Sequence, residues 1–213
     1  MIIYFDTETT GLTPGRIIQL SYVIDNDGEL TAKNFFFAVE YVPPEVVAIH
    51  GFSAEKLAVL SNGKTFSDCI DEIDNDFKKA DVIVAHNVNF DVKFLEAEFS
   101  YQDRIFKYNE TLDTMKYFCN VCKLPRSNHK GYKYPKLVEL TEFLDIYPYD
   151  ITRETINLFK NASSFHDARY DTVAVYLSVK KAINEYLEIE NLLKKPWKVQ
   201  LFTVFYMLNL FFK

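Results

Sequence analysis

The sequence has 213 residues, enough for one sizeable hydrophobic core but cramped for a second full domain. A hydrophobic content of 48%, with 19 Phe and 14 Tyr, excludes a disordered chain and predicts an aromatic interior. The net charge of -6 argues against general nucleic-acid binding through bulk charge, because a polyanion is normally met by a basic face. Any such site must depend on local charge.

Three strands are predicted early in the chain, at residues 2–5, 16–25 and 29–39. The second and third are rich in Ile, Val, Tyr and Phe, and residues 25–28 (DNDG) join them. An Asp-Gly pair between two such runs is typical of a β-hairpin. The chain is therefore expected to begin with antiparallel strands.

Helical spacing replaces the strand pattern after residues 42–44 (VPP). Ser53 is a candidate N-cap for a short helix through Leu60, and apolar residues recur at helical spacing over residues 66–77. Residues 82–85 (VIVA) form a short continuous apolar run, as expected of a strand that is buried on both faces.

Asn89 is the candidate N-cap of the next helix. A strand near residues 111–115 and helices over 136–145 and 165–194 complete the predicted elements. Alternating strands and helices after an antiparallel start predict an α/β fold, with a mixed central five-stranded sheet flanked by helices. The residues of the helix after Asn89 that are expected to face inward are Phe90, Phe94, Leu95 and Phe99.

Residues 1–195 are expected to form one domain, and residues 196–213 an apolar C-terminal tail. The stretch 199–212 (VQLFTVFYMLNLFF) is almost wholly apolar, but it is shorter than the roughly 18 to 20 residues that a spanning helix needs. We therefore expect no membrane span. Packing on the domain, an oligomer contact and binding of a partner protein all remain open.

The cysteine content indicates a reducing compartment, and hence a cytoplasmic protein, because the three cysteines are odd in number and no signal peptide is recognised. Cys119 and Cys122 form a CxxC pair without a second pair. A structural zinc site needs four ligands, so we expect two half-buried helical cysteines instead.

Acidic residues in four places are candidate ligands of a metal centre. Asp6 and Glu8 follow an apolar run two residues apart, so a strand would point both carboxylates at one face. Mg²⁺ and Mn²⁺ prefer such oxygen ligands, and two cations can activate a water and stabilise a leaving oxygen. Asp6 is the expected bridge, with Glu8 and Asp171 on one cation and Asp91 on the other. Singly, Asp91 would be an ordinary first-turn acid favoured by the helix dipole.

His166 is the candidate general base, since histidine can accept a proton from water at neutral pH. It lies five positions before Asp171, which is roughly 140° away on a helical wheel, so the two cannot share one helix face. Ser164 and Asp167 resemble a capping box that would start the helix near Phe165. His166 is then expected on a mobile first turn above the metals.

The motifs that contain these residues resemble those of the DEDDh family of 3′-to-5′ exonucleases, with particular likeness to the epsilon proofreading subunits of bacterial DNA polymerase III. Three motifs occur in order: FDTETTGL (5–12), AHNVNFDVKFL (85–95) and HDARYD (166–171). Two intermediate segments also match, IHGFS (49–53) and LDT (112–114).

The resemblance implies a ribonuclease H-like fold, two divalent cations and stepwise release of nucleoside monophosphates from a 3′ end. Residue by residue, it implies that His166 is the general base. It implies that the terminal nucleotide is held by Thr9, Leu12, Asn87 and Phe90. The metal ligands that it implies are Asp6, Glu8, Asp91 and Asp171.

The other histidines are less informative. His86 matches a family position near the site, but a strand-end histidine that bonds to the backbone is an equally good interpretation. His50 is expected to be structural, and His129 has no assigned role.

A basic segment at residues 123–136 (KLPRSNHKGYKYPK) has five Lys or Arg, two Tyr and no acid. Lys130 and Lys133 could meet phosphates, and Tyr132 or Tyr134 could stack on a base. The alternative is an ordinary solvated loop.

The leading interpretation is a proofreading or repair exonuclease that acts on single-stranded or frayed DNA 3′ ends. The alternative is the same chemistry on RNA, as in RNase T and oligoribonuclease. A catalytically idle nucleic-acid or polymerase-binding module is disfavoured, because four converging carboxylates repel one another without metal. Possible partners are a DNA polymerase and a sliding clamp. Gln200 and Phe205 have the outer spacing of a clamp-binding peptide, although Thr203 departs from the expected aliphatic residue.

Overall fold

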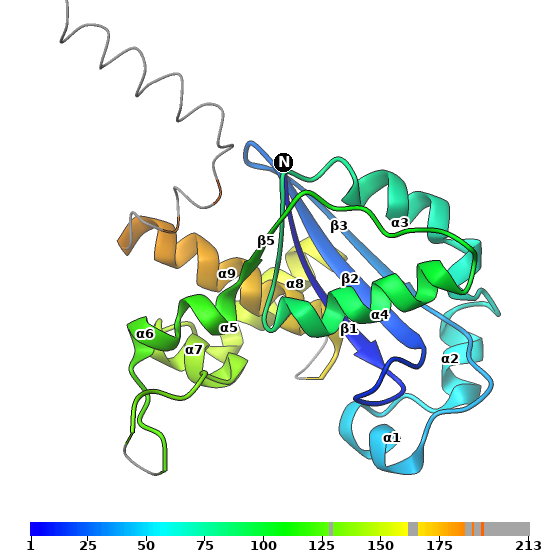
Figure 1. Ribbon diagram of the computed structural model, residues 1–213, viewed down its shortest axis with the longest axis horizontal. Helices are drawn as coiled ribbons and strands as arrows, with labels where there is room; N and C mark the ends of the chain where they lie inside the picture. Colours follow the sequence, from blue (N-terminus) through cyan, green and yellow to red (C-terminus); the bar gives the residue numbers. More distant parts are fainter. Residues whose placement is uncertain (128–129, 162–165, 186–188, 190–192, 194–213) are drawn as a thin grey trace, which may run out of the picture.

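A five-stranded sheet forms the centre of the protein, with the strand order β3-β2-β1-β4-β5 (Figure 1). The computed structural model describes residues 1–127, 130–161, 166–185, 189 and 193. The strands are β1 (Ile2–Thr9), β2 (Ile17–Asn26), β3 (Glu29–Phe36), β4 (Val82–Ala85) and β5 (Glu110–Asp113).

The sheet is mixed, as predicted. β1 pairs antiparallel with β2, and β2 with β3, whereas β1 with β4 and β4 with β5 are parallel. The carboxyl ends of β1, β4 and β5 therefore lie at one edge of the sheet. β1 runs further than β4 there, since their pairing ends at Tyr4 and Val84.

Helices cover both faces of the sheet (Figure 1). α3 (Ile70–Phe77) and α4 (Val88–Ser100) pack on one face, and α7 (Leu137–Phe143), α8 (Pro148–Phe159) and α9 (Ala168–Glu185) on the other. The remaining described helices are α1 (Pro44–His50), α2 (Ala54–Leu60), the short 3-10 helix η1 (Phe66–Asp68), α5 (Thr114–Tyr117) and α6 (Cys119–Cys122).

The alternation of β1 divides the core into two clusters. Ile3 and Phe5 join the α3 and α4 cluster, whereas Tyr4 joins the cluster with α7, α8 and α9. Because alternate residues of a strand share a face, Asp6 and Glu8 continue the Tyr4 row toward α9, and Thr7 continues the row toward α4.

Several local predictions are confirmed. Asp27 and Gly28 have φ values of 54° and 97°, as a tight hairpin turn requires, and the Gly28 N–H donates to Asp25 Oδ1 over 2.8 Å. Ser53 caps α2, since its side chain accepts a hydrogen bond from the Lys56 N–H. β4 is buried at all four positions.

Two predicted helix starts are wrong. Asn89 does not cap α4, because the helix begins at Val88 after Asn87, which has a left-handed φ of 76°. The last helix begins at Ala168 rather than near residue 165, so His166 precedes the helix instead of lying in its first turn. Ser164, the proposed cap, is outside the described residues.

Three of the described helices were not predicted: α1, α5 and α8. α5 begins inside the strand predicted near residues 111–115. α1 and α8 have proline at the first helical position, where its missing N–H costs no hydrogen bond. In α8 the buried residues Ile151 and Thr155 lie one turn apart, a spacing that could have indicated the helix.

The described part of the chain contains no helix that is both long and apolar enough to cross a membrane. The predicted tail, residues 196–213, lies outside the described residues. Cys119 is half-buried and Cys122 is buried, both in α6. Burial raises the pKa of the Cys122 thiol to about 11.

Candidate active site

The site is built where β1 extends beyond its neighbour β4. Asp6 and Glu8 point from this part of β1 toward α9, and both are half-buried. Asp171 lies in the first turn of α9 and is buried. The strand and the helix therefore bring residues more than 160 positions apart to one place.

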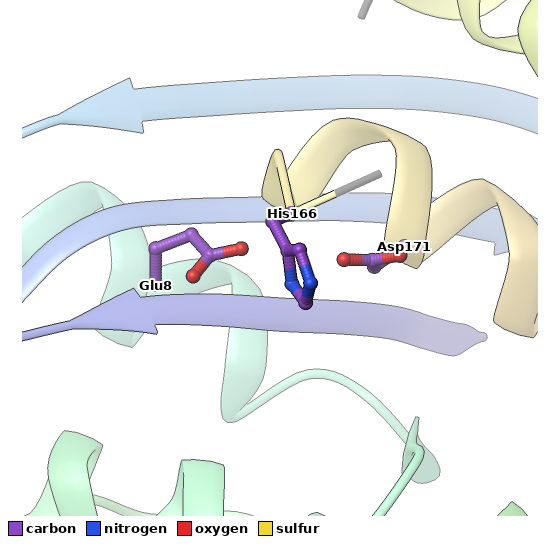
Figure 2. Close-up of side chains that lie close together, drawn as sticks. All are labelled: Glu8, His166 and Asp171. Carbon is purple, nitrogen blue, oxygen red and sulfur yellow. The ribbon is translucent and has the colours of Figure 1, made fainter. Parts of the chain in front are cut away.

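Glu8, His166 and Asp171 each present a ligand atom within 4.8 Å of the other two. Figure 2 shows the His166 imidazole between the two carboxylates in this view. His166 has a φ of 63°, a conformation that few non-glycine residues adopt. A backbone hydrogen bond from His166 lowers the pKa of Asp171, although burial raises it more. His166 therefore lies just before α9 in a left-handed backbone conformation, with its main chain hydrogen-bonded to Asp171.

Asp91 reaches the site from the opposite face of the sheet. Its Oδ1 accepts hydrogen bonds from the Thr7 N–H over 3.2 Å and from Thr7 Oγ1 over 2.7 Å. The Thr7 N–H is available because the pairing of β1 with β4 has already ended. The Asp91 carboxylate therefore accepts the hydrogen bond that a neighbouring strand would otherwise accept from this N–H. It lies beside Asp6.

Four carboxyl groups share this small volume, and their pKa values rise. Burial and the charge of Asp171 raise the pKa of Glu8 to about 8. Burial raises the pKa of Asp91 and of Asp171 to about 7. For Asp6, burial followed by the charges of Asp171, Asp91 and Glu8 raises the pKa well above its usual range. Without a compensating cation, these groups hold protons near neutral pH.

This donor set fits divalent cations. All four acids supply the oxygen ligands that Mg²⁺ and Mn²⁺ prefer, and their mutual repulsion is relieved by positive charge. Asp171 Oδ1 is buried and has no hydrogen-bond partner among the described residues. A buried carboxylate oxygen without a donor is costly, and a cation would satisfy it.

The residues predicted to hold a nucleotide lie around the same edge. Thr9 is buried, and its Oγ1 donates to the Gly11 carbonyl over 2.8 Å, which shapes the turn after β1. Leu12, in that turn, is 89% exposed. The Asn87 N–H donates to Asp113 Oδ1 over 3.1 Å, and the half-buried Phe90 contacts Phe94.

His86 uses both ring nitrogens within the protein. Nδ1 lies 3.0 Å from Thr114 Oγ1, and Nε2 lies 2.9 Å from the Pro135 carbonyl oxygen. Burial lowers its pKa, so the imidazole is neutral. This arrangement agrees with the structural interpretation of His86, and it ties the end of the basic segment to the strand edge that carries the site.

Most of the described residues of the basic segment are exposed, but Lys133 is half-buried and Pro135 is buried. Lys133 Nζ pairs with Glu139, and Lys130 is exposed. Arg126, Lys133 and Tyr134 contribute to the lining of an open surface hollow of about 410 Å³.

Sequence analysis missed Thr7, and it named Asp167 only as a capping-box residue and not as part of the site. Thr7 stands between the two acids of the first motif, and its position on the alternate face could have indicated a contact with α4. Asp167 follows His166 and contributes to raising the pKa of Asp6, Glu8 and Asp171 through its charge.

Replacing Thr7 by Val is expected to lower kcat about tenfold, because Asp91 loses the shorter of its two hydrogen bonds from Thr7 and is oriented less firmly. The loss of one buried hydrogen bond should lower the free energy of unfolding by about 1 kcal/mol. Nuclease kinetics and thermal unfolding would measure the two effects separately.

Thr155→Val is a matched control. Thr155 is fully buried on α8, and its Oγ1 donates to the Ile151 carbonyl over 2.8 Å. We expect a similar loss of stability with unchanged kcat. Equal kcat values for the two variants would show that Thr7 has no orienting role.

Comparison with known proteins shows the family and the fold of this chain. The exonuclease family model named for RNase T matches residues 3–177, and the chain belongs to that family. The solved structure of Escherichia coli exonuclease I with a dA16 oligonucleotide is similar, with a TM-score of 0.67, 17% identity, and coverage of 88% of this chain and 41% of that one. The same enzyme with dT13 gives a TM-score of 0.69 at 17% identity, covering 89% and 42%. The predicted ribonuclease H-like fold is confirmed.

Curated relatives include epsilon subunits of DNA polymerase III. The chain is 34% identical over 123 residues to the Rickettsia conorii protein, covering 53% of this chain and 52% of that one. It is 37% identical over 100 residues to the Treponema pallidum protein, covering 45% of each. The matched region spans about half the length of these relatives.

Proposed function

We propose that this protein is a metal-dependent 3′-to-5′ exonuclease that removes nucleoside 5′-monophosphates from single-stranded or frayed DNA 3′ ends, in proofreading or repair. The observation that carries the proposal is the convergence of Glu8, His166 and Asp171 within 4.8 Å, beside Asp6 and Asp91. Membership of the exonuclease family supports it.

In the proposed reaction a water oxygen forms a bond to the phosphorus of the terminal phosphodiester. The bond from that phosphorus to the 3′ oxygen of the preceding nucleotide breaks, and this oxygen gains a proton. His166 accepts the proton of the attacking water. Partial desolvation of its imidazole lowers the pKa, which favours the neutral form that can accept a proton. Asp6, Glu8, Asp91 and Asp171 would hold two divalent cations, Mg²⁺ or Mn²⁺, which supply positive charge to the reacting phosphate.

DNA is proposed over RNA for two reasons. The relatives are named as DNA polymerase subunits, and the similar solved structures contain dA16 or dT13. The alternative is an exoribonuclease of the RNase T or oligoribonuclease type. Its one support is the name of the matching family model.

One assay separates these functions. End-labelled DNA and RNA of the same sequence are incubated with Mn²⁺, with Asp6→Ala as the control. A ladder shortened from the 3′ end of DNA, absent with the control, is expected. Preferential shortening of RNA supports the ribonuclease alternative. If neither DNA nor RNA is cleaved in a metal-dependent way, the catalytically idle binding module is the remaining interpretation.

The basic segment is proposed to contact the substrate strand. Replacing Lys130 and Lys133 together by Ala should raise the Michaelis constant about 3- to 10-fold at low salt. It should also reduce the salt slope by up to about 1.4, because each phosphate contact on a single strand contributes about 0.7. Lys133 already pairs with Glu139, so its share is expected to be the smaller one.

Lys78 and Lys107 provide a matched control pair. They line another surface hollow together with Tyr108, at the edge where β4 and β5 begin, opposite the edge that carries Glu8. Replacing both by Ala removes the same charge, and we expect no change in the salt slope. Equal slopes for the two double variants would rule out a specific contact at the basic segment.

A DNA polymerase is proposed as a partner, because the relatives are named as polymerase subunits. A sliding clamp is a weaker proposal that rests on the spacing of Gln200 and Phe205, which lie outside the described residues. A cytoplasmic location is proposed from the cysteine content.

A further inference from the structure

Gln19 is a fully buried amide that lies beside the candidate active site, on the strand next to Glu8. It lies on β2 and is the register partner of Glu8 on β1. Residues that are partners in an antiparallel pair point to the same face, so Gln19 and Glu8 both face α9. A buried polar side chain at this position needs hydrogen-bond partners.

All hydrogen bonds of the Gln19 side chain lead away from its own strand. Nε2 donates to Asn34 Oδ1 on β3 over 2.8 Å and to Asp167 Oδ1 over 3.0 Å. Oε1 accepts the Ala168 N–H over 3.2 Å. Two acceptors face Nε2 and one donor faces Oε1, so the amide has a single consistent orientation.

Asp167 is bound from its other side by Arg169. The guanidinium donates through Nε over 2.9 Å to Asp167 Oδ1, and through its terminal nitrogen over 2.6 Å to Oδ2. The Arg169 N–H also donates to Asp167 Oδ1 over 3.0 Å, which makes Asp167 the acceptor at the start of α9. Gln19 thus connects this helix start to the sheet.

We propose that Gln19 is a positioning residue that sets where His166 and Asp171 lie relative to Glu8. It binds residues 167 and 168, which stand between the two functional side chains in the chain. It is also tied to Glu8 by strand register. The left-handed conformation of His166 persists only if the surrounding structure fixes it, and these bonds supply an anchor one residue away.

The kinetic consequence rests on the proposed function, whereas the structural consequence does not. Gln19→Met fills a similar volume without the hydrogen bonds. We expect kcat to fall about 10- to 100-fold with the Michaelis constant changed less than about 3-fold, since a small misplacement affects the reaction more than binding. Amide hydrogen exchange of Ala168, measured by NMR, should accelerate at least about tenfold, because its acceptor is lost.

Ser178→Ala is a matched control for the loss of a buried polar contact. Ser178 is fully buried on α9, well beyond the first turn of the helix that Gln19 contacts. Its Oγ donates to the Ala174 carbonyl over 2.7 Å. We expect some loss of thermal stability, with kcat and Ala168 exchange unchanged.

An introduced charge tests the contact itself. Gln19→Glu keeps an acceptor for the Ala168 N–H but places a carboxylate against Asp167 Oδ1. It should therefore lower kcat more than Gln19→Met.

Each outcome decides the proposal. Unchanged Ala168 exchange in folded Gln19→Met overturns it, as does an equal fall in kcat for Ser178→Ala. If the wild-type chain cleaves neither DNA nor RNA, the proposed function fails, and Ala168 exchange still decides whether Gln19 fixes the helix start.

Discussion

Asp6→Asn is expected to lower metal-dependent nuclease activity by about 10³-fold or more while stabilising the metal-free protein. The activity falls because Asp6 lies among Glu8, Asp91 and Asp171 and is the proposed bridge between the cations. Single-turnover cleavage of end-labelled DNA in Mn²⁺ would measure this loss.

The gain in stability follows from the raised pKa values. A carboxyl group whose pKa is higher in the folded protein than in the unfolded chain has no effect on stability well below about pH 4, where both states are protonated. As the pH rises, the unfolded chain ionises first, and the folded state becomes relatively less stable until the folded pKa is passed. Glu8, with a pKa of about 8, extends this window toward pH 8.

Removing one of the four charges should therefore stabilise the metal-free fold by on the order of 1–2 kcal/mol near pH 8. For a chain of this size, we expect Tm in EDTA to rise by about 3–6 °C. The difference from wild type should shrink as the pH falls and vanish well below about pH 4. Added Mn²⁺ should raise the Tm of the wild type and not that of Asp6→Asn.

Asp76→Asn is a control that should change Tm in the opposite direction. Asp76 accepts hydrogen bonds from Lys33 over 2.6 Å and from the Tyr22 hydroxyl over 2.9 Å, so its charge is compensated. We expect a lower Tm at every pH where the carboxylate is ionised. A Tm that also falls for metal-free Asp6→Asn near pH 8 would contradict the electrostatic account of the site.

His166→Gly is expected to lower kcat by about 10²- to 10⁴-fold, the range typical of a lost general base, with little change in the Michaelis constant. His166 is exposed and not part of the core, so the thermal stability should change little. Added imidazole should restore part of the rate, because it can occupy the space of the lost side chain. A variant with wild-type kcat would exclude His166 as the base.

The pH profile provides an independent measurement. Although the His166 side chain is exposed, partial desolvation of its imidazole lowers the pKa below its usual value of about 6.5. The acid limb of kcat should therefore lie below pH 6.5 in the wild type. Protonation of the four carboxylates should produce a second acid limb, because protonated acids bind cations poorly. This second limb should move to lower pH as the Mn²⁺ concentration rises. A single limb that moves entirely with Mn²⁺ would contradict the proposed role of His166.

The strands were predictable because their signals are local. The hairpin at residues 25–28 needs positive φ at Asp27 and Gly28, and an Asp-Gly pair satisfies this without tertiary help. β4 is buried on both faces, which requires a continuous apolar run. The spacing of Asp6 and Glu8 fixed their common face through strand geometry alone.

Helix starts were less predictable, because tertiary contacts replaced the expected local caps. Asn87 enters α4 in a left-handed conformation, and its N–H bonds to Asp113 on β5, so Asn89 has no capping role. At α9, Asp167 accepts the Arg169 N–H and is itself held by Gln19 from β2. Neither partner is close in sequence.

The sequence by itself determined the chemistry of this protein, through four carboxylates and a histidine in motifs whose residue types suit divalent cations and proton transfer. Only the tertiary structure decided their geometry. Asp91 reaches the site because β4 ends early and leaves the Thr7 N–H unpaired, and His166 precedes α9 because Asp167 is bound to the sheet. Both depend on contacts between distant segments, which spacing along the chain does not encode.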